Sequence, residues 1–337
     1  MNLVDTPFVE EQLFPFTLTR AIADIRVGIL TIRDKWLLTT GSGGFQNIPS
    51  NLLPSSEIIR CLHSGNPVSE ETGAIFINHP WHIFQYNDLA IRLDFALLTT
   101  GRVSESISKT NQVICAENIF LEEGAQAEYC TLNAATGPIY IGKNAEIMEG
   151  SVIRGPFALC EGGIVKMGTM IYGATTIGPF SVAGGEIKNS VIFGYSNKGH
   201  HGYLGDSVVG EWCNLGAGTS NSNVKNNAGE VKIHNPITGS TIGVGNKCGL
   251  LMGDYSRSAI NTSFNTGTVT GVCCNIFSDG LTQSYIPSFT WCGKDPARYE
   301  FGKALRDIEN WKKLKKHSLT NEEINKLKHI FDNHKSL

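Results

Sequence analysis

The sequence of 337 residues lacks the features of several classes of protein. Its nine cysteines include no Cys-x-x-Cys pair and no disulfide-scaffold spacing, which predicts reduced thiols in a cytoplasmic protein. No apolar run approaches the roughly 20 residues that span a bilayer, and the first residues show neither a signal nor a lipidation motif. The net charge is -3 and the basic residues are scattered except at Lys312–Lys316. Neither a membrane nor a nucleic acid is therefore expected as a partner.

The first hundred residues also lack a phosphate-binding loop. Their glycine cluster, Gly41-Ser-Gly-Gly44, is followed by Phe45-Gln-Asn rather than by basic residues. A nucleoside triphosphate needs backbone amides and cations around its phosphates, so we interpret this cluster as a turn. Residues 1–105 mix short apolar runs with turn signals and are predicted to form a small α/β segment that ends in a linking helix over residues 80–94.

A six-residue repeat dominates the middle of the chain. Counting in sixes from Ile141 gives an aliphatic or small residue at every step: Ile147, Ile153, Leu159, Val165, Ile171, Ile177 and Ala183. An α-helix repeats every 3.6 residues and an open strand every two, so a period of six indicates a parallel β-helix in which each short strand turns one side chain inward. We predict a mainly β fold with a parallel β-helix over residues 106–290.

The residues after the repeat have helical spacing. We expect C-terminal helices over residues 291–337, the first starting near Pro296. Thr320 and Glu323 form a capping box at the start of the second. The run Lys312–Lys316 is interpreted as a solvated helix end, where cations interact well with the helix dipole.

The gaps between blocks of hexads hold the candidate catalytic residues. His200 and His201 lie between Gly199 and Gly202, where an exposed histidine has no packing role. Imidazole has a pKa near 6.5 and can accept a proton at neutral pH. The alternative is that both histidines only hydrogen-bond the backbone of a loop.

Polar side chains around these gaps are candidate substrate ligands. Asn214 and Asn223 carry amides for sugar hydroxyls or carbonyls, and Lys188 and Lys232 can neutralise a phosphate. Asparagine ladders also occur in β-helices for structural reasons, so Asn214 has a structural alternative. No metal site is predicted.

Several of these segments resemble a known family. Residues 184–192, 199–206 and 214–219 resemble the acetyltransferase half of the bacterial bifunctional N-acetylglucosamine-1-phosphate uridylyltransferase and glucosamine-1-phosphate acetyltransferase. Residues 18–33 and 210–216 resemble a related bacterial family of sugar nucleotidyltransferases. The resemblance implies a left-handed β-helix, a homotrimer with acyl-transfer sites between subunits, and a reduced nucleotidyltransferase-like domain over residues 1–105.

The resemblance also implies roles for individual residues. His200 would be the general base, with His201 as the alternative, and Ala217 between Gly216 and Gly218 would approach the thioester of acetyl-CoA. The implied ligands of an amino sugar phosphate are Lys188, Tyr203 and Asn223. The chain lacks the family's phosphate-binding arginine after the Gly178-Pro-Phe180 turn.

We therefore predict an acyl-CoA-dependent N-acetyltransferase that acts on an amino sugar phosphate or a nucleotide-linked amino sugar, with its histidine base at a trimer interface. Acyl transfer of this kind requires no metal. The alternatives are a sugar-1-phosphate nucleotidyltransferase, although the nucleotide loop is missing, and a catalytically silent trimeric scaffold or binding protein.

Overall fold

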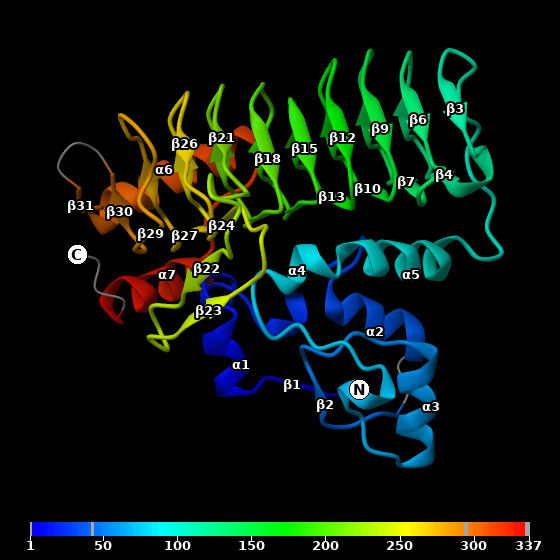
Figure 1. Ribbon diagram of the computed structural model, residues 1–337, viewed down its shortest axis with the longest axis horizontal. Helices are drawn as coiled ribbons and strands as arrows, with labels where there is room; N and C mark the ends of the chain where they lie inside the picture. The colour runs from blue at the N-terminus through cyan, green and yellow to red at the C-terminus, as the bar shows by residue number, and fades with distance from the viewer. Residues whose placement is uncertain (1, 42–43, 293–295, 334–337) are drawn as a thin grey trace.

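The computed structural model describes residues 2–41, 44–292 and 296–333. Its centre is a left-handed parallel β-helix, as predicted, in which each turn adds one short strand to each of three sheets (Figure 1). Ser42 and Gly43 of the glycine cluster lie outside the described residues.

Each of the three sheets is named by how many strands it contains. The nine-strand sheet contains β4 (Ile119–Leu121), β7 (Ile139–Ile141), β10 (Phe157–Leu159), β13 (Thr175–Ile177), β16 (Val191–Ile192), β19 (Val208–Val209), β24 (Leu250–Met252), β27 (Thr268–Thr270) and β29 (Tyr285–Ile286). The ten-strand sheet contains β5 (Gln126–Ala127), β8 (Glu146–Ile147), β11 (Ile164–Val165), β14 (Val182–Ala183), β17 (Asn197–Lys198), β20 (Asn214–Leu215), β25 (Arg257–Ser258), β28 (Asn275–Ile276), β30 (Thr290–Trp291) and β31 (Ala297–Arg298). The six-strand sheet contains β3 (Gln112–Ile114), β6 (Thr131–Asn133), β9 (Val152–Arg154), β12 (Met170–Tyr172), β15 (Glu186–Lys188) and β18 (Tyr203–Gly205), and the pair β21 (Ser220–Asn221) and β26 (Ser263–Phe264) follows it.

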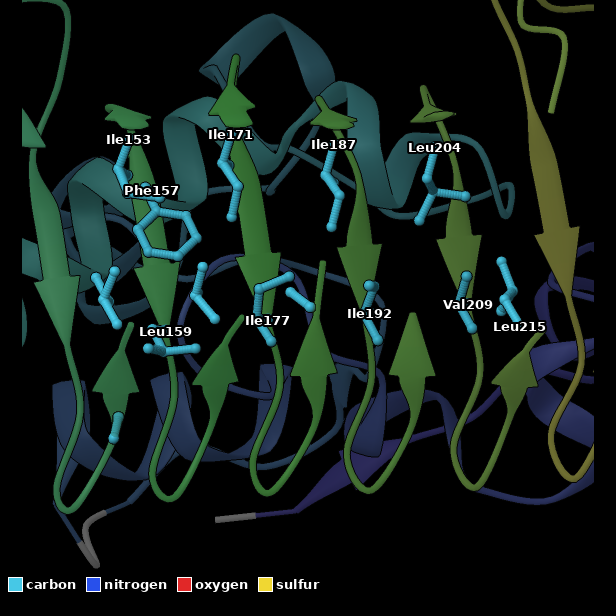
Figure 2. Packing of buried hydrophobic residues seen from close by; sticks show 14 of the residues in the cluster. Ile153, Phe157, Leu159, Ile171, Ile177, Ile187, Ile192, Leu204, Val209 and Leu215 are labelled. Carbon is cyan, nitrogen blue, oxygen red and sulfur yellow. The ribbon is translucent and has the colours of Figure 1, made fainter. Parts of the chain in front are cut away.

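The hexad residues are the inward-facing residues of these strands. Leu159 lies in register between Ile141 and Ile177 in the nine-strand sheet, and each of the three is fully buried. Figure 2 shows the resulting rows of aliphatic side chains, one row from each wall of the β-helix. The predicted repeat therefore forms one continuous core along the axis.

An aromatic ladder follows the corner between the nine-strand and ten-strand sheets. Phe180, Tyr195 and Trp212 each have a positive φ there, and Tyr195 stacks on Trp212 with ring centroids 4.4 Å apart. A positive φ is unfavourable for a bulky side chain, so ring stacking offsets strain at this corner.

The C-terminal helices α6 (Phe301–Leu314) and α7 (Asn321–Asn333) pack against the continuation of this corner (Figure 1). The predicted capping box of α7 is confirmed: Glu323 N–H donates to Thr320 Oγ1, and Thr320 N–H donates to Glu323 Oε2. The predicted helix start at Pro296 is wrong, because β31 follows that residue and α6 begins at Phe301.

The N-terminal segment is mostly helical. It contains α1 (Pro7–Gln12), α2 (Ile32–Thr40), α3 (Ser56–Ser64), α4 (His82–Gln85) and α5 (Asn87–Thr99), the 3-10 turns η1 (Phe16–Leu18), η2 (Ile22–Asp24) and η3 (Glu70–Thr72), and the short parallel pair β1 (Leu3–Val4) and β2 (Ile48–Pro49). A further 3-10 turn, η4 (Ala116–Asn118), lies at the start of the β-helix. The linking helix predicted over residues 80–94 is split at Tyr86.

The N-terminal segment covers the outer face of the nine-strand sheet (Figure 1). Asn87 at the start of α5 donates from Nδ2 to the carbonyl of Ala174 at 2.9 Å and accepts from Thr176 Oγ1 at 3.2 Å. A hairpin of β22 (Lys232–His234) and β23 (Thr241–Gly243), inserted between two turns, adds Val231 and Ile233 to the same core. The segment and the sheet therefore share buried apolar surface.

Over the described ranges, none of the helices has both the length and the apolar character needed to cross a membrane.

Candidate functional site

The two candidate histidines lie at the corner where the chain passes from β17 in the ten-strand sheet to β18 in the six-strand sheet. His200 and His201 are both exposed. Gly202 follows them with φ +123°, and a Cβ on it would lie 2.0 Å from the carbonyl oxygen of Thr219. A glycine is therefore required for this corner to pack against the next turn.

That next turn carries the residues predicted to meet the thioester. The N–H of Gly218 donates to the carbonyl of His201 at 3.0 Å, so the two corners are in direct contact. The N–H of Ala217 is not a donor in any hydrogen bond among the residues that the structure describes. The predicted base and the predicted thioester-binding backbone are thus neighbours, and the described residues leave the N–H of Ala217 unpaired.

The outer face of the six-strand sheet brings together three predicted substrate ligands. Lys188 and Tyr203 lie on adjacent strands, β15 and β18. Asn223 donates from Nδ2 to the hydroxyl of Tyr203 at 3.1 Å and also to Asp206 Oδ2. Asn189 donates to the other oxygen of Asp206 at 2.7 Å. Asp206 therefore fixes the orientation of the amide groups on this face.

Tyr172 and Glu186 were not identified from the sequence, and both belong to this face. Tyr172 donates its hydroxyl hydrogen to Glu186, and the ammonium of Lys188 lies 5.7 Å from the centre of the Tyr172 ring. The hydrogen bond to Glu186 raises the pKa of Tyr172 to about 12, and burial, assisted by Asp206, raises the pKa of Tyr203 to about 12. Both phenols are neutral at physiological pH, and Tyr203, whose hydroxyl accepts from Asn223, can donate its own hydrogen to a substrate. Tyr172 and Lys188 each follow an inward residue of the sheet, which is the sequence signal for this face.

A buried lysine supports the histidine corner, and sequence reasoning missed it. Lys198 occupies an inward-facing position of the ten-strand sheet, next to Ala183, and is 1% exposed. Its Nζ donates to the carbonyls of Gly184 at 3.1 Å and His200 at 2.5 Å, and burial lowers its pKa to about 8. Counting six residues on from Ile192 identifies this position as a core position.

Asn214 and Lys232 lie apart from the group on the six-strand sheet. Asn214 is on β20, in register between Asn197 and Arg257 on the ten-strand sheet. Lys232 is exposed on the inserted hairpin, which packs toward the N-terminal segment.

The turn at Gly184, which precedes the histidine corner, is closely packed. A Cβ on Gly184 would lie 2.5 Å from the carbonyl oxygen of Gly199, so the turn before the histidines has no space for a side chain. Across the described ranges, no three His, Cys, Asp or Glu side chains are grouped so that they could hold a metal ion.

The chain has matches among family models, curated proteins and solved structures. Residues 1–53 match the family model described as sugar nucleotidyl transferase. The bifunctional protein GlmU of Methanocaldococcus jannaschii is 33% identical over 109 residues, which are 32% of this chain and 26% of that protein. GlmU of Methanococcus maripaludis strain C5 is 28% identical over 216 residues, 62% of this chain and 46% of that protein. The resemblance to these two families is confirmed.

The chain spans less than half the length of these curated relatives. Among solved structures, it is similar to LpxA, a UDP-N-acetylglucosamine acyltransferase from Bacteroides fragilis. That similarity has a TM-score of 0.27 at 14% identity and covers 68% of this chain and 98% of the other.

Proposed function

We propose that the protein is an acyl-CoA-dependent N-acyltransferase whose acceptor is an amino sugar phosphate or a nucleotide-linked amino sugar. The observation that supports it most directly is the contact between the His200–His201 corner and the Gly216–Gly218 corner. A general base and a free backbone N–H on adjacent turns are the two groups that acyl transfer to an amine requires.

In the proposed reaction the acceptor amine attacks the thioester carbon and a C–N bond forms. His200 takes the proton from the amine, and the N–H of Ala217 stabilises the negative charge that develops on the carbonyl oxygen. The C–S bond then breaks, and the proton passes from the imidazole to the leaving thiolate. Acetyl-CoA is the proposed donor, and this chemistry needs no metal.

The acceptor would lie on the outer face of the six-strand sheet. Tyr203 and Asn223 would hydrogen-bond the sugar, and Lys188 would pair with its phosphate. The histidine corner is exposed in the single chain, so we propose that a second copy in a homotrimer closes the site.

The test follows free thiol release from acetyl-CoA with glucosamine-1-phosphate as acceptor. A general base contributes about 100-fold or more, so His200→Ala should lower kcat by at least that factor, while His201→Ala should change it only a few-fold. His234→Ala, an exposed histidine on the inserted hairpin, is the matched control. A native protein that neither binds acetyl-CoA nor releases thiol with any amino sugar phosphate would contradict the proposal.

Nucleotidyl transfer is a second candidate because residues 1–53 match that family model. The arginines of the matched segment are, however, engaged within the chain. Arg20 pairs with Asp254 at 2.5 Å, and Arg33 pairs with Asp24 at 2.5 Å. Binding of UTP with Mg²⁺, measured by calorimetry, would favour this candidate.

A further inference from the structure

A buried arginine that forms no ion pair with any described residue lies on the outer face of the ten-strand sheet. Arg257 is on β25, in register between Asn214 and Asn275, and is 8% exposed. Its guanidinium carbon lies 5.3 Å from the centre of the Trp311 ring on α6. Helix α6 therefore covers the guanidinium of Arg257 on the outer face of the sheet.

Two of the three side-chain nitrogens of Arg257 have no partner in the part of the chain that the structure describes. Neither Nε nor Nη2 has a hydrogen-bond partner among the described residues, although both atoms are buried. Arg20, whose side chain is 8% exposed, has one nitrogen without a partner but pairs with Asp254, whereas Arg257 forms no ion pair with the described residues. A buried charge without a partner is costly, which points to an anionic ligand at this position.

A cavity of about 130 Å³ adjoins the arginine, between the sheet and α6. Its lining consists of Arg257, Asn275, Tyr299, Asp307, Asn310 and Trp311. This volume is large enough for a tetrahedral oxyanion. Asn310 is exposed, so the cavity reaches the surface there.

The acidic side chain in the lining limits which oxyanion fits. Asp307 accepts a hydrogen bond from the hydroxyl of Tyr299, and a carboxylate can accept more than one. An oxyanion that still carries a proton at neutral pH can donate it to Asp307, whereas fully ionised sulfate would be repelled by the carboxylate.

We propose that this cavity is a phosphate site, in which Arg257, Asn275 and Asn310 donate to the phosphate oxygens and Asp307 accepts the remaining proton. The ligand is free hydrogen phosphate, which keeps one proton at neutral pH, whereas a phosphate monoester has largely lost its second proton at pH 7. The site lies on β25, two strands along the sheet from the β17 strand that precedes the histidines, and does not depend on the proposed acyl transfer.

The experiment is calorimetric titration of the full chain with inorganic phosphate, sulfate and glycerol-1-phosphate at pH 7 and constant ionic strength. Phosphate should bind at least tenfold more tightly than sulfate. Arg257→Gln should weaken phosphate binding at least tenfold, and Arg60→Gln, an exposed arginine of the N-terminal segment, should leave it unchanged. Glycerol-1-phosphate should bind more weakly than inorganic phosphate, and equal or tighter binding of this monoester would contradict the role assigned to Asp307.

Two further variants keep the test independent of folding. Asp307→Asn should raise sulfate affinity to within about threefold of phosphate affinity, because the repelling charge is gone. Asn310→Asp places a negative charge at the exposed mouth of the cavity and should weaken phosphate binding at least tenfold without changing the unfolding midpoint. No phosphate binding by the native chain at millimolar concentrations, or equal binding by all variants, would overturn the proposal.

Discussion

Replacing Lys198 by methionine should make the protein more stable at pH 7 and less stable above about pH 10.5. Burial lowers the pKa of Lys198 from 10.5 to about 8, and each pKa unit corresponds to about 1.4 kcal/mol. Charged Lys198 therefore costs the folded protein about 3 kcal/mol at pH 7. Methionine is close to lysine in shape and removes that cost.

The substitution also removes the two hydrogen bonds that Lys198 donates to the carbonyls of Gly184 and His200. Their loss costs about 1–2 kcal/mol, so the variant should be about 1–2 kcal/mol more stable than the native protein at pH 7. Because the folded-state pKa is the lower one, the unfolded chain binds more protons between pH 8 and 10.5, and the native protein gains stability as pH rises through that window. Above it, the variant should be the less stable protein by a similar amount.

Urea unfolding midpoints at several pH values from 7 to 10.5 measure this difference. The matched control is Lys232→Met, since that lysine is exposed and its substitution should give a difference that does not vary with pH. A constant difference between native protein and Lys198→Met across the whole range would refute the reasoning, because it would mean that Lys198 does not change its protonation in that window.

Two further predictions concern positions where the structure leaves little freedom. Gly202→Ala should lower stability by more than about 2 kcal/mol because of its positive φ and the close carbonyl of the next turn, whereas Gly199→Ala, with its nearest neighbour at 3.3 Å, should cost less than about 1 kcal/mol in the same thermal unfolding assay. Arg20→Met should cost about 3–5 kcal/mol in urea unfolding, because it leaves Asp254 buried without its cation, while Arg60→Met at an exposed pair should cost under about 1 kcal/mol. Equal losses for the two arginine variants would contradict the second prediction.

The hexad period predicted the β-helix because inward positions must be apolar wherever turns stack. It could not predict where the period changes. From Ala183 the next inward residues are Ile187 and Ile192, four and five residues on instead of six. The inward lysine at position 198 lies directly after this change.

The candidate site was predictable to the extent that it follows from register. Lys188 and Tyr203 share a face because both stand next to inward residues of one sheet. Glu186 and Asp206 carry no signal of their own in a single sequence, because an acidic residue at an outward position or at a corner is ordinary. Lys232 was grouped with the site by sequence proximity, but an antiparallel hairpin interrupts the hexads and carries it elsewhere.

The covering of the nine-strand sheet has a consequence for how copies of the chain can meet. The β-helix is a three-sided prism, and one side is closed by the chain's own N-terminal segment and hairpin. The edge between the nine-strand and ten-strand sheets is occupied in part by α6 and α7. The edge opposite the closed side is the one that carries His200 and His201. The histidine edge is thus open to a neighbouring copy, and a copy that approached along it would control assembly and access of substrate to the imidazoles at the same place.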